Sequence, residues 1–488
     1  MKILKFSLII IAFINNLYLY KKIFMEKKKS KRLRFIPNKY DLNSIDVNKD
    51  IKEIYPYIEL SEKKSKKYFP PNMSKSIDSL GKKKVKTTFY TGTGGNIYIY
   101  WKQYLFYDKK KEYLEQFYEA LKTNLDIIEE NGEEESTNSF FMGDSGIYMF
   151  FCIYALDIKD SALFEMNFDK LIKLKKISKN NNAEVELLYG TSGYLYTLLF
   201  LKKYLIEEKT NIIIKENHLK ILDGTIIEIF NILLNVGINS MNKYEWNKCM
   251  LYPFPMSGKK NPKFYLGAAH GLIGAIYMLL STIKFFPELS KKIIKFGSES
   301  ITIGELLLDN IKYIQSLQIA STGNFPSDVE GNDSGDKVHF CHGCIGAIHL
   351  FLLAEELFPN NNFKQTAILC NKSLWERGLL YKGNGVCHGM SGIVFGLIKL
   401  YKETKNELYL KEAIGICKGT YDNEIQTLVK KYEDPQRKCV GIPDTPYSLM
   451  EGEGGCLVMY YDLVKVALNK DKNNQGSLWG IYPGYEIF

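Results

Sequence analysis

The stretch GLIGAIYMLL at residues 271–280 joins a Gly-x-x-Gly turn to a long apolar run, and this combination decides the fold. It occurs seven times, and the first glycines of the turns are Gly92, Gly143, Gly190, Gly271, Gly343, Gly389 and Gly452. Successive first glycines are 46 (343 to 389) to 81 (190 to 271) residues apart, the length of a helical hairpin with a variable loop. A repeat of this size indicates units that bury their apolar faces only against their neighbours.

The apolar runs have the period of helices. Examples are GIYMFFCIYAL from Gly146, YLYTLLFLKKYL from Tyr194 and AIHLFLLAEEL from Ala347. Apolar residues recur at i, i+3 and i+4, the runs are longer than strands, and no repeat has the pattern of a β-hairpin. We therefore predict an all-α array of seven helix pairs. A closed ring would gather the seven glycine turns at one end, and it would explain how 488 residues form one main domain.

The front of the chain differs from the repeats. Residues 1–24 form a hydrophobic segment that is short for a membrane span and interrupted by Asn15 and Asn16. It fits a signal-peptide core, an anchor, or an upstream extension of a protein that starts at Met25. Residues 25–86 form a basic, low-complexity lead-in whose first part suits an anionic membrane surface or is simply a solvated charge run. No recognition module accompanies it, so we expect no nucleic-acid partner.

The composition is that of a soluble core, with 45% hydrophobic and 25% charged residues. The nine cysteines are odd in number and their spacing suggests no disulfide framework. Several lie in apolar helical runs, where a free cysteine acts as a small buried hydrophobe. This pattern favours a reducing compartment, so we expect a cytoplasmic protein, with the plasma membrane as a further location through the basic N-terminus.

Three turns carry reactive side chains directly before the first glycine: Ala269-His270, Cys341-His342 and Cys387-His388. They hold three of the six histidines in the chain. If these turns face one another across a ring, both cysteines and one of the two adjacent histidines can meet. Two thiolates and one imidazole form a catalytic type of zinc site with an open fourth position. That position can hold a substrate thiol as a thiolate near neutral pH, which makes a nucleophile.

Three other interpretations compete with this site. Cys341 and Cys344 match a local Cys-x-x-Cys element, although that pattern usually accompanies a βαβ fold. A structural zinc site would take a fourth ligand from His339, His342 or Cys344. His270 could instead be a core histidine that hydrogen-bonds to a backbone carbonyl.

Seven segments together resemble the lanthionine synthetase C-like proteins, the eukaryotic relatives of bacterial lantibiotic cyclases. They are RFIPNKY at 34–40, ELLYGTSGYLYTLLF from Glu186, YLGAAHGLIGAIYMLL from Tyr265, VHFCHGCIG from Val338, KGNGVCHGMSG from Lys382, PDTPYSLMEGEGG from Pro443 and YPGYEI from Tyr482. The resemblance runs from Arg34 to the C-terminus. It implies that residues 87–488 form an α/α toroid, a barrel of seven helical hairpins in two nested layers with zinc at its centre.

The resemblance also implies roles for individual residues. The metal ligands are Cys341, Cys387 and His388, and the acid/base histidine is His270. A catalytic carboxylate falls on Glu186, for which a helix-capping role is the alternative. His342 is a further candidate, as a donor to the developing enolate.

The activity implied is zinc-dependent addition of glutathione to dehydroalanine or dehydrobutyrine residues in peptides or proteins, which forms thioethers. Glutathione contacts fall on Lys382, Asp444 and Arg34, and Gly441 stands where relatives carry arginine just before the Ile442-Pro443-Asp444 turn. The alternative function is a non-catalytic, zinc- and glutathione-binding adaptor at the membrane surface. The sequence shows no paired carboxylates of the kind that glycoside hydrolysis requires.

Overall fold

The computed structural model describes residues 34–68, 70–71, 86–131, 137–180, 184–207, 215–255, 261–296, 299–431, 433–434, 439–440, 445–469, 478–485 and 487. The hydrophobic segment 1–24, the basic cluster up to residue 33, Asp444 and Gly441 lie outside the described residues. The predictions that rest on them, including membrane association, therefore stay predictions.

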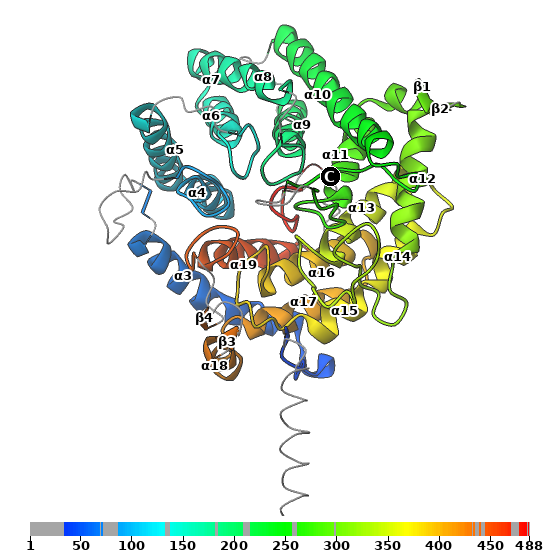
Figure 1. Ribbon diagram of the computed structural model, residues 1–488. Helices are drawn as coiled ribbons and strands as arrows, with labels where there is room; N and C mark the ends of the chain where they lie inside the picture. The colour runs from blue at the N-terminus through cyan, green and yellow to red at the C-terminus, as the bar shows by residue number, and fades with distance from the viewer. Residues whose placement is uncertain are drawn as a thin grey trace, which may run out of the picture.

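Seven helices form an inner ring, and each begins within or directly after one of the Gly-x-x-Gly turns. They are α4 (Gly94–Phe106), α6 (Ser145–Ile158), α9 (Thr191–Glu207), α11 (Leu272–Phe285), α13 (Cys344–Leu357), α16 (Met390–Thr404) and α19 (Glu453–Leu468). Each packs against the next along the chain, and α19 packs against α4, so the ring closes (Figure 1). Most residues of these helices are buried on every side, which is why their sequences are apolar all round rather than amphipathic.

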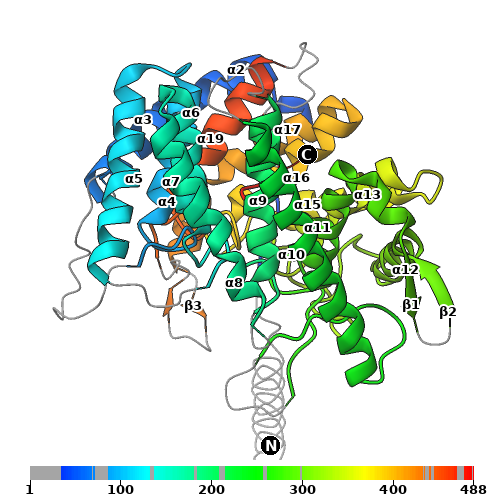
Figure 2. The ribbon, with the colours of Figure 1, turned by 90° about the horizontal axis from the view of Figure 1, so that it is seen from above.

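A second layer of helices surrounds the ring and packs against it. In the order of their inner partners, they are α5 (Lys111–Asn131), α7 (Ser161–Lys173), α10 (Glu216–Lys243), α12 (Ile303–Ser316), α14 (Phe363–Leu369) followed by α15 (Asn371–Arg377), α17 (Glu407–Gly419) and α3 (Tyr55–Tyr68). The predicted all-α toroid of two nested layers is confirmed: the outer helices surround the inner ring in Figure 1, and Figure 2 shows the same helices turned by 90°. The seventh outer helix, α3, comes from the range 25–86 that the sequence assigned to a lead-in, and it packs against α19.

The remaining elements are short and lie in connections or at the edge. They are η1 (Leu42–Ser44), α2 (Val47–Asp50), η2 (Lys52–Ile54), α8 (Lys175–Ser178), η3 (Pro287–Lys291), β1 (Ile293–Phe296), β2 (Glu299–Thr302), α18 (Asn423–Lys431), β3 (Glu433–Asp434) and β4 (Cys439–Val440). β1 and β2 form an antiparallel hairpin with Ile293 opposite Thr302. It lies between α11 and α12 in the sequence. The seven apolar runs form helices, as expected, whereas this connection contains a β-hairpin. α10 is long and apolar enough to cross a membrane, and in the toroid it packs against α9 and α11.

The first glycine of each turn is required by a close approach of the backbone. In all seven turns, a Cβ atom on that glycine would overlap the carbonyl oxygen of the residue six positions earlier. Gly143 meets the carbonyl of Thr137 in this way, and Gly389 meets that of Gly383. The chain therefore folds back tightly on itself just before each inner helix, and only glycine fits. This geometry is the physical reason for the sevenfold sequence signature.

Candidate metal centre

The seven glycine turns are joined to one another in a ring of hydrogen bonds at one end of the barrel. Six of the links include backbone N–H to carbonyl bonds: Tyr90 to Phe141 (3.0 Å), Leu188 to Ala269 (3.3 Å), Ala268 to Phe340 (3.4 Å), Phe340 to Cys387 (3.1 Å), Cys387 to Met450 (2.8 Å) and Met450 to Tyr90 (3.2 Å). The remaining link is a side-chain bond, from Ser139 Oγ to the carbonyl oxygen of Leu188 at 2.6 Å. The ring fixes each turn relative to its neighbours, so the side chains just before the glycines have set positions.

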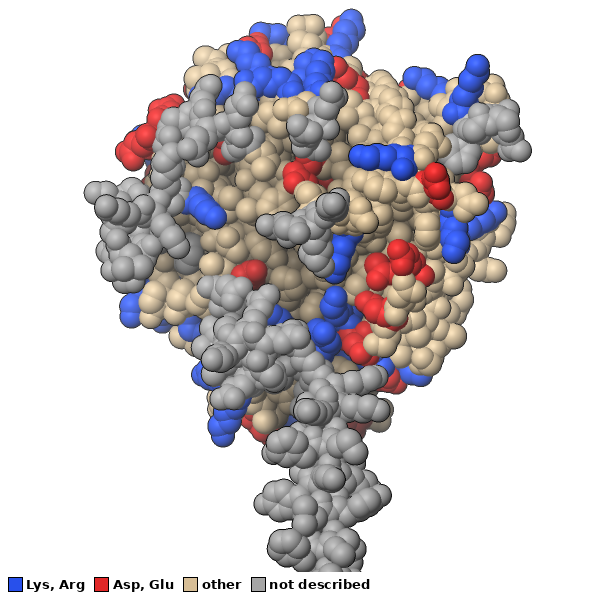
Figure 3. Space-filling model, in the orientation of Figure 1, with Lys and Arg blue, Asp and Glu red and all other residues tan. Residues whose placement is uncertain are grey.

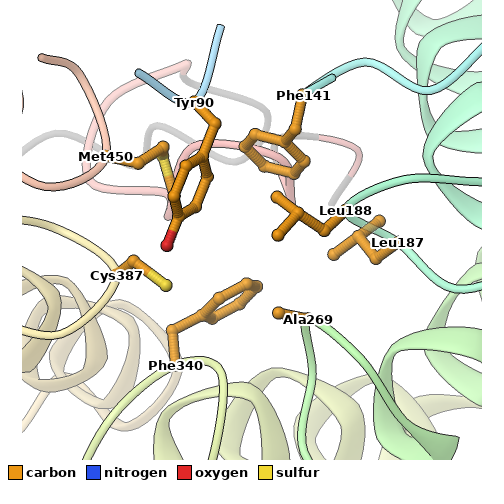
Figure 4. Close-up of a pocket in the computed structure, with 8 residues that line it drawn as sticks. All are labelled: Tyr90, Phe141, Leu187, Leu188, Ala269, Phe340, Cys387 and Met450. Atoms are coloured by element: carbon orange, nitrogen blue, oxygen red, sulfur yellow. The ribbon is translucent and has the colours of Figure 1, made fainter. Parts of the chain in front are cut away.

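A small pocket lies at the centre of this ring. Every turn contributes to its lining, which consists of Tyr90, Phe141, Leu187, Leu188, Ala269, Phe340, Cys387 and Met450 (Figure 4). Figure 4 shows the hydroxyl group of Tyr90 and the sulfur of Cys387 pointing toward the same space. The rest of the lining is apolar. A thiol group and a phenol group therefore face an otherwise apolar chamber.

Cys341, Cys387 and His388 come together beside this pocket. Their potential ligand atoms all lie within 4.8 Å of one another, and Cys387 Sγ is 3.8 Å from His388 Nε2. Both cysteines are buried. No other group of three metal-binding side chains occurs in the described part of the chain, and His339, His342 and Cys344 are not part of this one. The group thus offers three ligands and no fourth, which suits a catalytic rather than a structural zinc site.

The chemistry of these side chains fits a divalent cation. Burial, and then the neighbouring Cys341, raise the pKa of Cys387 well above its ordinary value, so two uncompensated thiolates at this point would be unfavourable. A bound cation reverses this balance because it stabilises thiolates directly. Zn²⁺ prefers soft sulfur and imidazole ligands, and two thiolates neutralise its charge. The residues therefore fit zinc.

His270 lies on the adjacent turn and is held by Glu186. The Nδ1 atom of His270 is 3.0 Å from Oε2 of Glu186, a carboxylate that is only 1% exposed. Glu186 also accepts hydrogen bonds from the backbone N–H groups of Leu188 (3.0 Å) and Tyr189, in its own turn. The carboxylate therefore caps its turn and orients the histidine at the same time. With Nδ1 directed at Glu186, Nε2 of His270 is left to exchange a proton with a substrate.

His342 follows the ligand Cys341 and has a different environment. Burial, and then the charge of Lys337, lower the pKa of His342 to about 3, so the imidazole is neutral at pH 7. Its Nδ1 atom is buried without a hydrogen-bond partner among the described residues. Its ring centre is 6.1 Å from that of His270 and 4.9 Å from that of Tyr265. His342 thus lies between the metal-ligand group and His270 without a carboxylate to orient it.

Basic side chains from distant parts of the chain lie near the ligand group. Residues 34–36 pair with residues 379–381 through bonds from Ile36 N to Leu379 O (2.7 Å) and from Tyr381 N to Arg34 O (3.2 Å). This pairing brings Arg34 close to Lys382, and the charges of both residues act on the buried His339. Two of the three predicted glutathione contacts are therefore brought together, while Asp444 lies outside the described residues.

Lys337, Tyr90 and Glu451 also lie at the site, although no motif predicted them: Tyr90 lines the pocket, and the charge of Glu451 acts on His388. Lys337 is half-buried, and its Nζ donates a hydrogen bond to Ser327 Oγ at 3.0 Å. Burial lowers the pKa of Lys337, and the charges of Arg34 and Lys263 act in the same direction. Figure 3, drawn in the orientation of Figure 1, shows Lys and Arg side chains beside the hollow near the centre of the visible face of the molecule.

A signal for two of these residues is present in the sequence. Tyr90 stands two positions before its glycine, as Cys341 and Cys387 do, and Glu451 stands one position before, as His270 and His388 do. Aligning the seven turns on their first glycines would have placed both residues at the site. Lys337 stands six positions before Gly343, but the residue at this position differs in chemistry from turn to turn, so the repeat gives no signal for a cation there.

Comparisons with known proteins agree with this geometry. The family described as lanthionine synthetase C-like protein matches residues 83–475. The chain is 28% identical over 334 residues to the Danio rerio protein named glutathione S-transferase LANCL1, a match that covers 68% of this chain and 72% of that protein. It is 26% identical over 304 residues to the Arabidopsis thaliana LanC-like protein GCL1, covering 62% of this chain and 58% of that protein.

Among solved structures, nisin cyclase has a similar fold. The TM-score is 0.56 at 15% sequence identity, and the match covers 87% of this chain and 98% of nisin cyclase. The family match spans all seven glycine turns and the three clustered ligands. This chain belongs to the lanthionine synthetase C-like family.

Proposed function

We propose that this protein is a zinc-dependent transferase that adds the thiol of glutathione to dehydroalanine or dehydrobutyrine residues in peptides or proteins. The observation that carries the proposal is the group of Cys341, Cys387 and His388, with no fourth ligand among the described residues, beside the Glu186–His270 pair. The relative named glutathione S-transferase LANCL1 supports glutathione as the thiol. The similarity of the fold to that of nisin cyclase is consistent with a peptide acceptor. The thiol ligands favour the reducing cytoplasm as the site of action.

Zinc, bound by Cys341, Cys387 and His388, would supply a thiolate at neutral pH by lowering the pKa of an incoming thiol. The net reaction adds S–H across the carbon–carbon double bond. Sulfur bonds to the β-carbon, the π electrons move toward the α-carbon, and a proton must reach that carbon. His270 is the residue that delivers this proton through Nε2, and Glu186 stabilises the protonated imidazole and fixes its orientation.

The remaining residues of the site bind and enclose the substrates. Glutathione carries two carboxylates, and Arg34, Lys337 and Lys382 are the cations placed to receive them. The apolar lining of the pocket excludes water from the reacting carbon atoms and strengthens the electrostatic interactions within the site.

Incubation of the purified, zinc-loaded protein with glutathione and a dehydroalanine-containing peptide tests the proposal. Mass spectrometry should detect a peptide–glutathione thioether, and metal analysis of the same preparation should give one zinc per chain. Cys341→Ala and His388→Ala should each lose both the zinc and the product. Full zinc occupancy without thioether formation would contradict the enzymatic proposal and would favour a binding protein that uses the same site.

A further inference from the structure

The C-terminal segment 478–485 lies inside the ring of inner helices (Figure 1, red). Two lysines, the buried Lys102 and the half-buried Lys402, hold its beginning. Lys102 Nζ donates to the carbonyl oxygen of Leu478 at 2.8 Å, and Lys402 Nζ donates to that of Trp479 at 2.8 Å. The segment then continues into the interior of the barrel, where its tyrosines are fully buried. It is therefore a fixed part of the core.

Tyr482 contacts both turns that carry the cysteine ligands. Its hydroxyl group donates a hydrogen bond to the carbonyl oxygen of Val386 at 3.1 Å. Its ring stacks on that of Phe340, with ring centres 3.9 Å apart and planes at 14°. Val386 directly precedes Cys387, and Phe340 directly precedes Cys341. One side chain thus reaches the backbone next to one ligand and the side chain next to the other.

Tyr485 is the natural comparison, because it is equally buried in the same segment. Its ring stacks on Tyr277 at 4.0 Å and meets Phe340 edge-on at 5.2 Å. Its hydroxyl oxygen has no hydrogen-bond partner among the described residues. Removing this hydroxyl group therefore removes no contact with a ligand turn. Removing that of Tyr482 breaks the bond to Val386 and leaves both stacked rings in place.

We infer that Tyr482 is a positioning residue for the metal centre, which holds the Cys341 and Cys387 turns at the correct separation from inside the barrel. The inference rests on the proposed function, since it assumes that these turns bind a metal. The turns are already joined by the bond from Phe340 N to Cys387 O at 3.1 Å. Tyr482 adds a second connection between the same two turns. Residues that orient metal ligands in this way commonly change metal affinity by about 10–100-fold.

The test compares Tyr482→Phe with Tyr485→Phe in the full chain. Co²⁺ is the probe, because thiolate coordination gives it a visible absorption signature, and a competing chelator measures its affinity. We expect Tyr482→Phe to weaken Co²⁺ binding about tenfold. Tyr485→Phe should leave binding within about twofold of wild type, since no hydrogen bond is lost. Thermal unfolding of the metal-free proteins reports on the core separately from the metal.

The outcomes separate the inference from the proposed function. If wild type binds Co²⁺ and Tyr482→Phe binds it equally well, the inference is overturned and the metal centre stands. Equal losses in both variants would also overturn it, because the bond to Val386 would not be the cause. If wild type gives no thiolate–Co²⁺ absorption, the metal centre itself is refuted and the inference fails with it.

Discussion

Six of the seven turns form two groups of three, here called the apolar half and the reactive half of the ring. The two groups have the same backbone arrangement and differ in their side chains. The first three turns present Tyr90-Thr91, Phe141-Met142 and Leu188-Tyr189 before the glycine, and the next three present Ala269-His270, Cys341-His342 and Cys387-His388. In both halves, the first glycine packs against the carbonyl oxygen six residues earlier and an inner helix follows. The scaffold is therefore repeated, whereas the three clustered metal-binding side chains and His270 occupy two positions in three repeats. Function depends on the side chains placed at those positions rather than on the fold.

The apolar half also contributes to the site, because its residues line part of the pocket. Phe141 and Leu188 line the pocket opposite Cys387, and both are buried. Together with Tyr90 they enclose the side of the chamber that carries no ligand. A low-dielectric wall at this place strengthens the interactions of the reactive half. One half supplies the reacting groups and the other supplies their environment.

The strongest test of the comparison is Cys387→Ala, in the reactive half. We expect activity to fall by more than about 100-fold and metal to be lost, because loss of a ligand exceeds the cost of losing a residue that only orients one. Metal analysis and thioether formation measure the two effects. Cys417→Ala is the control, since Cys417 is equally buried but lies in α17 of the outer layer. Comparable metal loss in both variants would show that burial, and not ligation, explains the result.

His270→Ala should come next in size. We expect kcat to fall by about 10²–10⁴-fold with metal content unchanged, since proton delivery is lost but the ligand group is intact.

Glu186→Gln should have a smaller effect on kcat, of about 10–100-fold, because the histidine remains but loses the carboxylate that orients it. Steady-state kinetics with metal analysis on each variant measures both. A Glu186→Gln enzyme with wild-type kcat would leave Glu186 with the capping role alone.

Lys337→Met tests the basic side of the site. We expect the KM for glutathione to rise about tenfold, which is the scale of one partly exposed charge-assisted hydrogen bond. The matched measurement uses cysteamine, a thiol without carboxylates, for which KM should not rise. A rise with both thiols would mean that Lys337 supports the structure of the loop rather than binding a carboxylate.

Met142→Ala should have the smallest effect on chemistry. Met142 occupies in the apolar half the position that His270 occupies in the reactive half, and it is half-buried. We expect a stability loss of about 1 kcal/mol, typical of such a truncation, and activity within about twofold of wild type. Thermal unfolding and kinetics on the same preparation check this. A loss of activity near that of His270→Ala would remove the distinction between the halves.

Much of the fold and the ligand set could be predicted, because both depend on local features. The glycine turns and the apolar runs are contiguous in sequence, so each inner helix could be placed from its own residues. Cys341 and Cys387 could be identified because they occupy corresponding places in such turns, but His342 and His388 also correspond to each other, and only the resemblance to the lanthionine synthetase C-like proteins singled out His388. Glu186 was predicted with two alternative roles, and its contacts with His270 and with its own turn serve both. Lys337 could not be identified, because the residue six positions before the first glycine differs in chemistry from turn to turn.

The sequence by itself determined the number of repeats, the start of every inner helix and which turns carry sulfur and imidazole. Tertiary structure alone decided the contacts between segments hundreds of residues apart. It placed α3 on α19, Arg34 beside Lys382 and the C-terminal segment inside the barrel. The physical reason is that a turn is specified by sterics within a few residues. These contacts depend instead on the closure of the whole ring, which no short stretch of sequence encodes.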